Sequence, residues 1–345
     1  MTDAAELPVD FAPDRLERFL NGRFGPGALD LQRIGGGQSN PTYFVTHGGR
    51  RMVLRKQPRG PILRGAHAID REYRAMRAFG ATDVPVPGMI LYHDDADPLG
   101  TPFYLMERVE GRVFTDARLP DMAPAERRAI YLSMAETLAR LHGHAPDRIG
   151  LGDFGRPGDY FARQLHRWTD QLAGSSFAGN PVLNDLAAEI AARMPGDDGL
   201  VAIAHGDFRL GNLLYHPTEP RVVAVLDWEL STVGHPLADL GFAAIPWHSQ
   251  PDEFGGILGH VSPGIPSEAE FFAAYRAVLP SVPAPSAFHV AFALFRFAVV
   301  FVGIADRAAA GSAADPGAAR YAPLAERFAI RARELLAGRP HEVTG

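Results

Sequence analysis

The segment that most constrains the fold runs from Ala204 to Leu240 and carries three oxygen-bearing side chains at fixed separations. Asp207 and Asn212 stand close together, and Asp227 directly follows an apolar run at 222–226. That run is rich in β-branched residues, which is typical of a short buried strand, so the strand would deliver Asp227 to one edge of a sheet. We therefore expect the two carboxylates and the amide to converge on one site.

Such a set of side chains suits metal-assisted phosphoryl transfer. Donor phosphates reach an enzyme bound to Mg²⁺, which prefers hard oxygen ligands such as carboxylates and amide oxygens. A further carboxylate has to orient the acceptor hydroxyl and take its proton, and Asp207 is our candidate for that role. Asp and Asn also favour turns, so each residue alone has a structural interpretation; their order and separations together favour chemistry.

The order His205–Asp207, then Asn212, then a strand and residues 227–229, resembles the catalytic core of protein-kinase-like enzymes. More narrowly, it resembles the aminoglycoside phosphotransferase (APH) and choline-kinase-like family of small-molecule kinases. The run up to Asp239 is similar to the branch that also occurs fused to acyl-CoA dehydrogenases. The resemblance extends from about Ile34 onward. It implies an α+β, bilobal fold with a small antiparallel-sheet N-lobe and a mostly helical C-lobe, and it implies ATP and Mg²⁺ as cofactors.

The resemblance also implies roles for single residues. Asp207 is the base, while Asn212 and Asp227 hold Mg²⁺. Arg209 stands where many kinases carry a lysine that steadies the transferred phosphoryl group. A surface arginine without a catalytic role is an equal alternative.

Neighbouring polar residues are open to more than one interpretation. We interpret His205 as a structural support of the catalytic loop. Asp239 either braces that loop from behind or begins a helix as its cap, and we favour bracing. Glu229 either adds a metal contact or bonds a neighbouring backbone group.

Length and composition limit the class of protein. The chain has 345 residues, which is enough for two sizeable cores, and we predict lobes at 1–108 and 109–345. A net charge of −6 without a basic run gives no reason to expect nucleic acid or an anionic membrane as a partner. The absence of cysteine excludes disulfides and thiolate metal sites. The N-terminal residues lack the features of a secretory signal, so we expect a cytoplasmic protein. The expected partner is a small molecule.

The first lobe is predicted from its short apolar runs. An amphipathic helix at 14–24 precedes strands at 29–34, within 35–46 and at 51–56, which indicates an antiparallel meander. A glycine-rich turn lies between the first two strands. By resemblance it covers the nucleotide phosphates, although such turns often serve only to reverse the chain. The candidate phosphate contacts in this turn are Gly36, Gly37, Ser39 and Asn40.

The third strand supplies the expected phosphate-binding cation. Arg55 occupies the place of the kinase lysine and presents a permanently charged fork to phosphate oxygens. Lys56 would point to the other face of the strand. A helix predicted at 66–79 carries Glu72, which matches the carboxylate that pairs with this cation in kinases. A solvated surface glutamate is the alternative for Glu72.

Two further strands, at 89–92 and 102–106, should complete the small sheet. The chain then leaves the sheet, and a hinge between lobes belongs here. By resemblance, the backbone around Glu107 and Val109 would meet the adenine of ATP.

The second lobe is expected to be mostly helical. The segment 287–305 is long enough to span a bilayer, but its phenylalanines recur at helical spacing, which favours a buried core helix. The predicted helices are 124–141, 160–172 and 183–194, and the only predicted strands are 201–204, 212–215 and 221–226.

The acceptor is expected to be a small molecule, because the segment after Asp227 is too short for a phosphorylated activation loop. Its site is expected near Asp207, with Trp228, Asp239, Trp247 and His248 as neighbours. The branch resemblance favours a hydroxyacyl or fatty-acid-derived acceptor. An aminoglycoside or amino alcohol is the alternative, although 252–253 is the only small acidic cluster in the expected region. A nucleotide-binding pseudokinase scaffold is the alternative from another class.

Overall fold

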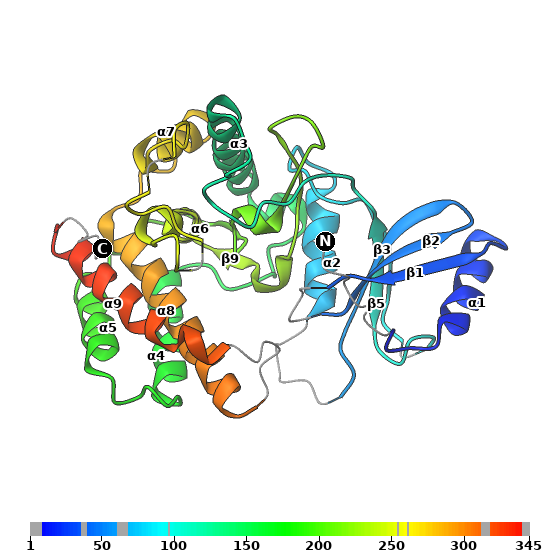
Figure 1. Cartoon of the computed structure of the whole chain (residues 1–345), viewed down its shortest axis with the longest axis horizontal. Helices are drawn as coiled ribbons and strands as arrows, with labels where there is room; N and C mark the ends of the chain where they lie inside the picture. The colour runs from blue at the N-terminus through cyan, green and yellow to red at the C-terminus, as the bar shows by residue number, and fades with distance from the viewer. Residues whose placement is uncertain are drawn as a thin grey trace. The chain divides into compact units, whose positions relative to one another are not determined.

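The computed structural model describes residues 9–35, 40–60, 68–95, 97–253, 255–260, 262–311 and 318–339 (Figure 1). The chain divides into two compact units. Unit 1 comprises Met1–Gly111 and Val223–Glu229, and unit 2 comprises Arg112–Val222 and Leu230–Gly345. A short segment that is distant in sequence therefore folds with unit 1.

Unit 1 is built on a five-stranded antiparallel sheet with the strand order β1-β2-β3-β5-β4. The chain leaves the sheet after β3 to form the helix α2 (Ile69–Phe79), and it returns at the outer edge as β4. The last strand then fits between β3 and β4. The strands are β1 Leu29–Arg33, β2 Thr42–His47, β3 Arg50–Lys56, β4 Met89–His93 and β5 Phe103–Glu107.

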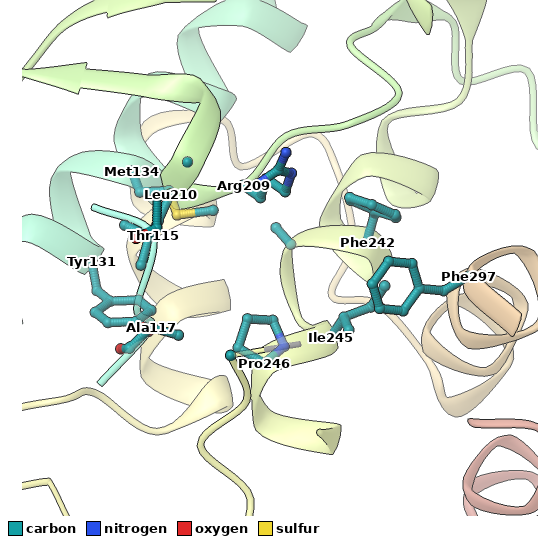
Figure 2. A pocket seen from close by; sticks show the side chains of 13 residues that line it. Thr115, Ala117, Tyr131, Met134, Arg209, Leu210, Phe242, Ile245, Pro246 and Phe297 are labelled. Carbon is teal, nitrogen blue, oxygen red and sulfur yellow. The ribbon is translucent and has the colours of Figure 1, made fainter. Parts of the chain in front are cut away.

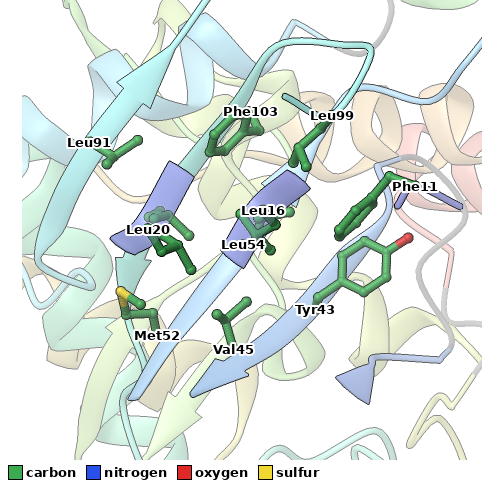
Figure 3. Close-up of a cluster of buried hydrophobic side chains, with 11 residues drawn as sticks. Phe11, Leu16, Leu20, Tyr43, Val45, Met52, Leu54, Leu91, Leu99 and Phe103 are labelled. Atoms are coloured by element: carbon green, nitrogen blue, oxygen red, sulfur yellow. The ribbon is translucent and has the colours of Figure 1, made fainter. Parts of the chain in front are cut away.

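Helix α1 (Pro13–Phe24) buries Leu16 and Leu20 against one face of this sheet, as Figure 3 shows. Met52 and Leu54 of β3 belong to the same cluster of buried apolar side chains. Because successive side chains of a strand point to opposite faces, Arg55 faces the other side, where α2 packs. The sheet therefore separates an apolar core from a polar face that carries the arginine.

The predicted α+β class and the strands of the first lobe are confirmed. Helix α1 begins one residue before its predicted start, and α2 is described from Ile69. Residues 66 and 67 of the predicted helix lie outside the described part of the chain.

The segment Val223–Glu229 packs within unit 1 at the end of α2. It contains most of β8 (Val222–Val225), and the Val225 N–H donates a hydrogen bond of 2.8 Å to the Pro85 carbonyl. The Trp228 ring lies 5.0 Å from the Phe79 ring, centroid to centroid. These contacts fix the residues on either side of Asp227.

Unit 2 is mostly helical, as predicted, and the three helices predicted in its first half are confirmed with ends shifted by one or two residues. Its α-helices are α3 Pro124–Gly143, α4 Tyr160–Ala173, α5 Pro181–Ala192, α6 Pro236–Ala243, α7 Glu268–Val278, α8 Ala287–Ala309 and α9 Ala322–Leu336. Short 3-10 helices are η1 Pro146–Ile149, η2 Leu210–Asn212, η4 Ile245–His248 and η5 Ala318–Tyr321, and η3 Trp228–Leu230 crosses the boundary of the units.

The expectation of only three strands in the second lobe is wrong. Besides β6 (Ala202–Ala204) and β7 (Leu213–Tyr215), the structure contains β9 (Thr232–Gly234), which pairs antiparallel with β6. A strand of three residues that ends in glycine shows no alternation from which it could be predicted. This pairing holds the catalytic segment between two fixed ends.

Helix α8 is the one helix among the described residues that is long and apolar enough to cross a membrane. About two thirds (67%) of its most apolar stretch is buried inside the protein, against α9, α6 and α5. The prediction of a buried core helix is confirmed, and the helix continues to Ala309.

Candidate active site

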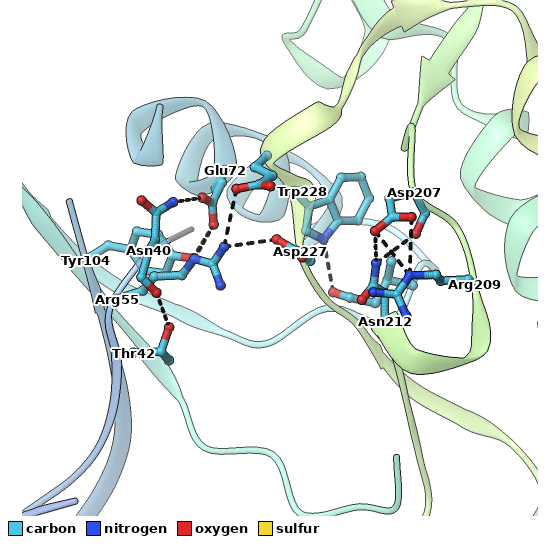
Figure 4. A network of polar contacts seen from close by, with 12 residues as sticks. Asn40, Thr42, Arg55, Glu72, Tyr104, Asp207, Arg209, Asn212, Asp227 and Trp228 are labelled. Carbon is cyan, nitrogen blue, oxygen red and sulfur yellow. Dashed lines mark hydrogen bonds and ion pairs between the residues drawn. The ribbon is translucent and has the colours of Figure 1, made fainter. Parts of the chain in front are cut away.

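A sharp turn presents Asp207. Gly206 adopts φ +85°, and a Cβ atom on it would lie 2.7 Å from the Leu230 carbonyl oxygen, so a larger residue would displace the backbone. The Asp207 side chain is 23% exposed and remains reachable from solvent. Its neighbours are Arg209, whose Nε lies 3.3 Å from both carboxylate oxygens, and Asn212 (Figure 4).

The orientation of Asn212 fits a metal ligand. Its Nδ2 donates to the Asp207 carbonyl oxygen at 2.8 Å and to Asp207 Oδ2 at 2.7 Å. Both amide hydrogens are thereby used, and no donor within the described residues contacts Oδ1. The oxygen that a hard cation prefers is therefore the atom left available.

A buried carboxylate braces this turn from behind. Asp239 accepts a hydrogen bond of 2.6 Å from the His205 N–H and one of 2.8 Å from the Gly206 N–H. Its Oδ2 also lies 3.2 Å from His142 Nε2, and the other ring nitrogen of His142 lies 2.8 Å from the Tyr275 hydroxyl. The predicted bracing role is confirmed. The cap of α6 is His235, not Asp239.

The electrostatic environment of Asp239 favours the ionised carboxylate. Burial alone would raise the pKa of Asp239, but the hydrogen bond and charge of His142, with further help from His205 and the Gly206 N–H, hold that pKa below its usual range. A buried carboxylate that accepts several hydrogen bonds in this way is a fixed negative charge. His205 is itself buried, and its Nδ1 accepts the Asp207 N–H at 3.2 Å, so its predicted structural role is confirmed.

The second polar cluster lies in unit 1 around Arg55. Arg55 Nε lies 2.9 Å from Glu72 Oε2, and its NH2 group donates to Asp227 Oδ1 at 2.9 Å (Figure 4). Glu72 also accepts hydrogen bonds from Asn40 Nδ2 at 2.7 Å and from the Tyr104 hydroxyl at 2.9 Å. The ion pair implied between Arg55 and Glu72 is present, and Glu72 is buried.

Burial controls the charges of this cluster. It raises the pKa of Glu72, and the attraction of Arg55 offsets that effect only in part. Burial also works against the charge of Arg55, yet the carboxylates of Glu72 and Asp227 raise its pKa above the usual arginine range. Lys56 lies on the opposite face, as predicted, where its ammonium is 2.8 Å from Asp10 Oδ2.

Asp227 has an unusual backbone. Its φ of +64° lies in the left-handed region, which is uncommon for a residue other than glycine. The side chain is 32% exposed and pairs with Arg55. Strained backbone positions of this kind are frequent at functional sites.

The other predicted cofactor contacts have mixed outcomes. Gly36, Gly37 and Ser39 lie outside the described residues. Asn40 is buried with its amide turned to Glu72. Glu107 is the exposed last residue of β5, and Val109 follows it two residues later. The nucleotide contacts of all these residues stay predictions.

The four acceptor neighbours proposed from sequence proximity stay predictions, and each of them makes a contact within the protein. Trp228 packs on Phe79, Asp239 braces the loop, the Trp247 indole donates to the Pro266 carbonyl, and His248 lies 3.0 Å from Glu268.

Unit 2 contains an apolar pocket beside the catalytic segment, with a cavity volume of about 80 Å³. Figure 2 shows Phe242 and Phe297 on one side of it, opposite Tyr131 and Leu210. Of the described residues that line it, Arg209 alone is charged. The lining residues are Thr115, Ala117, Tyr131, Met134, Arg209, Leu210, Gly211, Phe242, Ala243, Ile245, Pro246, Gly255 and Phe297.

Sequence reasoning missed three residues that support the loop: His142, Tyr275 and Arg296. Arg296 NH2 donates to the Gly206 carbonyl oxygen. The available signal was an arginine in the middle of the long apolar stretch of α8. His142 and Tyr275 give no comparable signal, since their roles depend on packing between distant helices.

Comparison with known proteins identifies relatives over most of the chain. Residues 30–271 match the phosphotransferase enzyme family, APH. Acyl-CoA dehydrogenase family member 11 of Gallus gallus is 40% identical over 317 residues, which cover 90% of this chain and 40% of that protein. Family member 10 of Mus musculus is 37% identical, covering 92% of this chain and 30% of that protein. The chain thus spans well under half the length of these curated relatives.

Solved structures show the same fold. The crystal structure of a candidate aminoglycoside phosphotransferase from Ralstonia eutropha has a TM-score of 0.83 and 40% identity, covering 94% of this chain and 99% of that one. An aminoglycoside phosphotransferase in a ternary complex with AMP-PNP and hygromycin B has a TM-score of 0.62 at 16% identity, covering 92% and 97%.

Proposed function

Because the chain belongs to the APH phosphotransferase enzyme family, we propose that it transfers the γ-phosphoryl group of ATP to a hydroxyl of a hydroxyacyl or fatty-acid-derived compound. The observation that carries the acceptor class is the apolar pocket of unit 2. Its wall includes Arg209, Leu210 and Gly211, which lie between the proposed base Asp207 and the proposed metal ligand Asn212.

Nucleotide use is supported by the solved phosphotransferase that holds AMP-PNP, an ATP analogue. In this chain Arg55 would contact donor phosphates, with Glu72 holding its guanidinium in place. Asp227 now pairs with Arg55, so phosphate and metal would replace that ion pair.

Each of the two proposed ligands carries an oxygen that suits Mg²⁺. Asn212 Oδ1 has no donor within the described residues, and the Asp227 carboxylate is partly exposed. When bound, Mg²⁺ would offset the negative charge of the donor phosphates. A magnesium site of this kind needs only one or two protein ligands, because waters and phosphates complete it.

Asp207 would orient the acceptor hydroxyl and accept its proton at Oδ1. Its other oxygen, Oδ2, is held at 2.7 Å by Asn212, whereas Arg209, at 3.3 Å, is the one side chain among the described residues that contacts Oδ1. The Arg209 side chain is 43% exposed and is free to turn from Asp207 towards a phosphoryl group.

The charge of unit 2 argues against a polycationic acceptor. The pocket lining carries no carboxylate among its described residues. Glu253, half of the acidic cluster noted in the sequence, is buried and ion-paired with Arg331 and Arg327, which keep its pKa low against the effect of burial. The described residues of this pocket would therefore compensate little of the positive charge of an aminoglycoside.

The test is Mg²⁺-dependent ADP release with a panel of acceptors: hydroxyacyl-CoA thioesters and hydroxy fatty acids of graded chain length, sugars, choline and aminoglycosides. We expect stimulation by the acyl compounds that increases with apolar chain length, and none with the Asp207→Ala variant. Stimulation by aminoglycosides alone would overturn the acceptor class. Tight Mg·ATP binding without stimulation by any compound would favour the scaffold interpretation.

A further inference from the structure

A second, much smaller cavity lies in unit 2 between α4, α6 and α8. Its volume is about 10 Å³, which is near the lower limit for one guest the size of a water molecule. It is separate from the acceptor pocket, although Phe242 contributes to both linings. Its lining residues are Tyr160, Gln164, Trp168, Ala238, Phe242, Phe292, Ala293 and Arg296.

Two residues that line this cavity each carry a buried N–H donor without a hydrogen-bond partner within the described residues. The two donors are Trp168 Nε1 and Arg296 Nε. Trp168 as a whole is only 7% exposed. Because more than nine in ten buried polar groups in proteins are paired, two unpaired donors beside one small cavity indicate a missing acceptor.

The charge of Arg296 indicates what kind of acceptor is missing. No carboxylate of the described residues lies within ion-pair distance of its guanidinium. That group is instead 5.5 Å from the Trp168 ring centroid and 5.0 Å from that of Phe242, and its NH2 donates to the Gly206 carbonyl. Arg296 is partly buried, and a cation in such a place without a nearby carboxylate favours an anion over a neutral guest.

The remaining polar groups of the cavity are also suited to an anion. Tyr160 and Gln164 have no side-chain hydrogen bond within the described residues. Burial raises the pKa of Tyr160 to about 12, so its hydroxyl keeps its proton at neutral pH and can donate. Gln164 can donate through its amide group.

We propose that this cavity binds one monovalent, atom-sized anion of the halide class, held by Trp168 Nε1 and Arg296 Nε. The small volume favours a single-atom anion over a larger oxyanion such as phosphate. The bound anion would fix Arg296, which in turn holds the Gly206 carbonyl next to Asp207. Arg296 is thus a positioning residue, and its counter-ion is part of the support of the loop.

Thermal unfolding with sodium chloride exchanged for sodium gluconate at constant ionic strength tests the site. For the wild-type protein we expect a saturable rise in Tm with chloride, of about 4 °C at one hundred times the dissociation constant. Trp168→Phe removes one donor but keeps an aromatic ring, and it should abolish the saturable rise. Trp247→Phe is the matched control, because that indole N–H already has the Pro266 carbonyl as its partner. An identical chloride response in all three proteins would overturn the proposal.

A second measurement does not depend on how well the variants fold. Crystals of the wild-type protein grown in sodium bromide should give an anomalous peak within hydrogen-bonding distance of both Trp168 Nε1 and Arg296 Nε. Density there without anomalous signal would identify a water molecule and would refute the anion site.

Discussion

The polar cluster of unit 1 and the polar cluster of unit 2 are built in different ways. Around Arg55 in unit 1, side chains hold one another through ion pairs, and one of these joins Arg55 to Asp227. Around Asp207 in unit 2, backbone N–H groups are fixed by the buried carboxylate of Asp239. In the proposed function, phosphate and metal would replace an ion pair of the first cluster, whereas the second cluster would keep its contacts.

This difference corresponds to the tasks of the two clusters. A group that binds a charged ligand can exchange one ion pair for another at little cost, because the charge is compensated in both states. A base has to be oriented before the reaction, since donors and dipoles that are already in place need no reorganisation in the transition state. Four substitutions test whether the two clusters differ in this way, and they are given in order of decreasing expected effect.

Asp207→Ala should have the largest effect. We expect kcat to fall by roughly 10²- to 10⁴-fold, because the group that accepts the hydroxyl proton is lost. The affinity for Mg·ATP should change by less than about threefold, since the proposed nucleotide contacts of unit 1 are unchanged. Steady-state kinetics and a nucleotide titration measure the two quantities. Full activity in this variant would show that Asp207 is not the base.

Asp239→Ala should lower the stability of the protein, because it removes the carboxylate that fixes the catalytic turn. The His205 and Gly206 N–H groups would lose their acceptor in a buried place, which should lower the free energy of unfolding by about 3 kcal/mol. Urea unfolding measures this loss. Asp239→Asn, which keeps one acceptor oxygen, should lose less.

The pH dependence of that loss has a definite sign. Because the pKa of Asp239 is depressed in the folded state, its stabilising contribution is fully present above the unfolded-state value of about 3.9 and is lost as pH falls through the lower folded value. The stability difference between wild type and Asp239→Ala should therefore shrink below about pH 4. A stability difference that stays constant down to pH 2 would contradict a stabilising role of the ionised Asp239 carboxylate.

Features that depend on local sequence could be predicted. The strands of unit 1 follow from short apolar runs, and Asp207, Asn212 and Asp227 form a motif with fixed separations. Arg55 was placed on the correct face because side chains alternate along a strand.

Features that depend on contacts between distant segments could not be predicted. His142 and Tyr275 reach the catalytic loop from α3 and α7. Nothing in the order of the sequence indicates that 223–229 folds with unit 1. The acceptor neighbours were likewise inferred from closeness to Asp207 in sequence, and one of them, Trp228, is buried.

Arg209→Gln should have an intermediate effect and should decide between the two interpretations of this arginine. The exposed pair with Asp207 contributes little to stability, so the free energy of unfolding should change by less than about 0.5 kcal/mol. If Arg209 steadies the phosphoryl group, kcat should still fall by about tenfold or more. Unchanged kcat would leave Arg209 as a surface residue of the pocket.

Arg55→Lys should have the smallest effect and tests whether the first cluster can rearrange. One ammonium cannot replace a fork whose Nε faces Glu72 and whose NH2 faces Asp227, so one of the two contacts should be lost. The positive charge for phosphate remains. We therefore expect KM for ATP to rise about fivefold while kcat changes by about twofold or less. Arg51→Lys, on the same strand in an exposed pair with Glu110, is the matched control and should leave both constants unchanged. A large fall in kcat with unchanged KM would mean that Arg55 acts in the transition state, and the cluster in unit 1 would then be as fixed as that around Asp207.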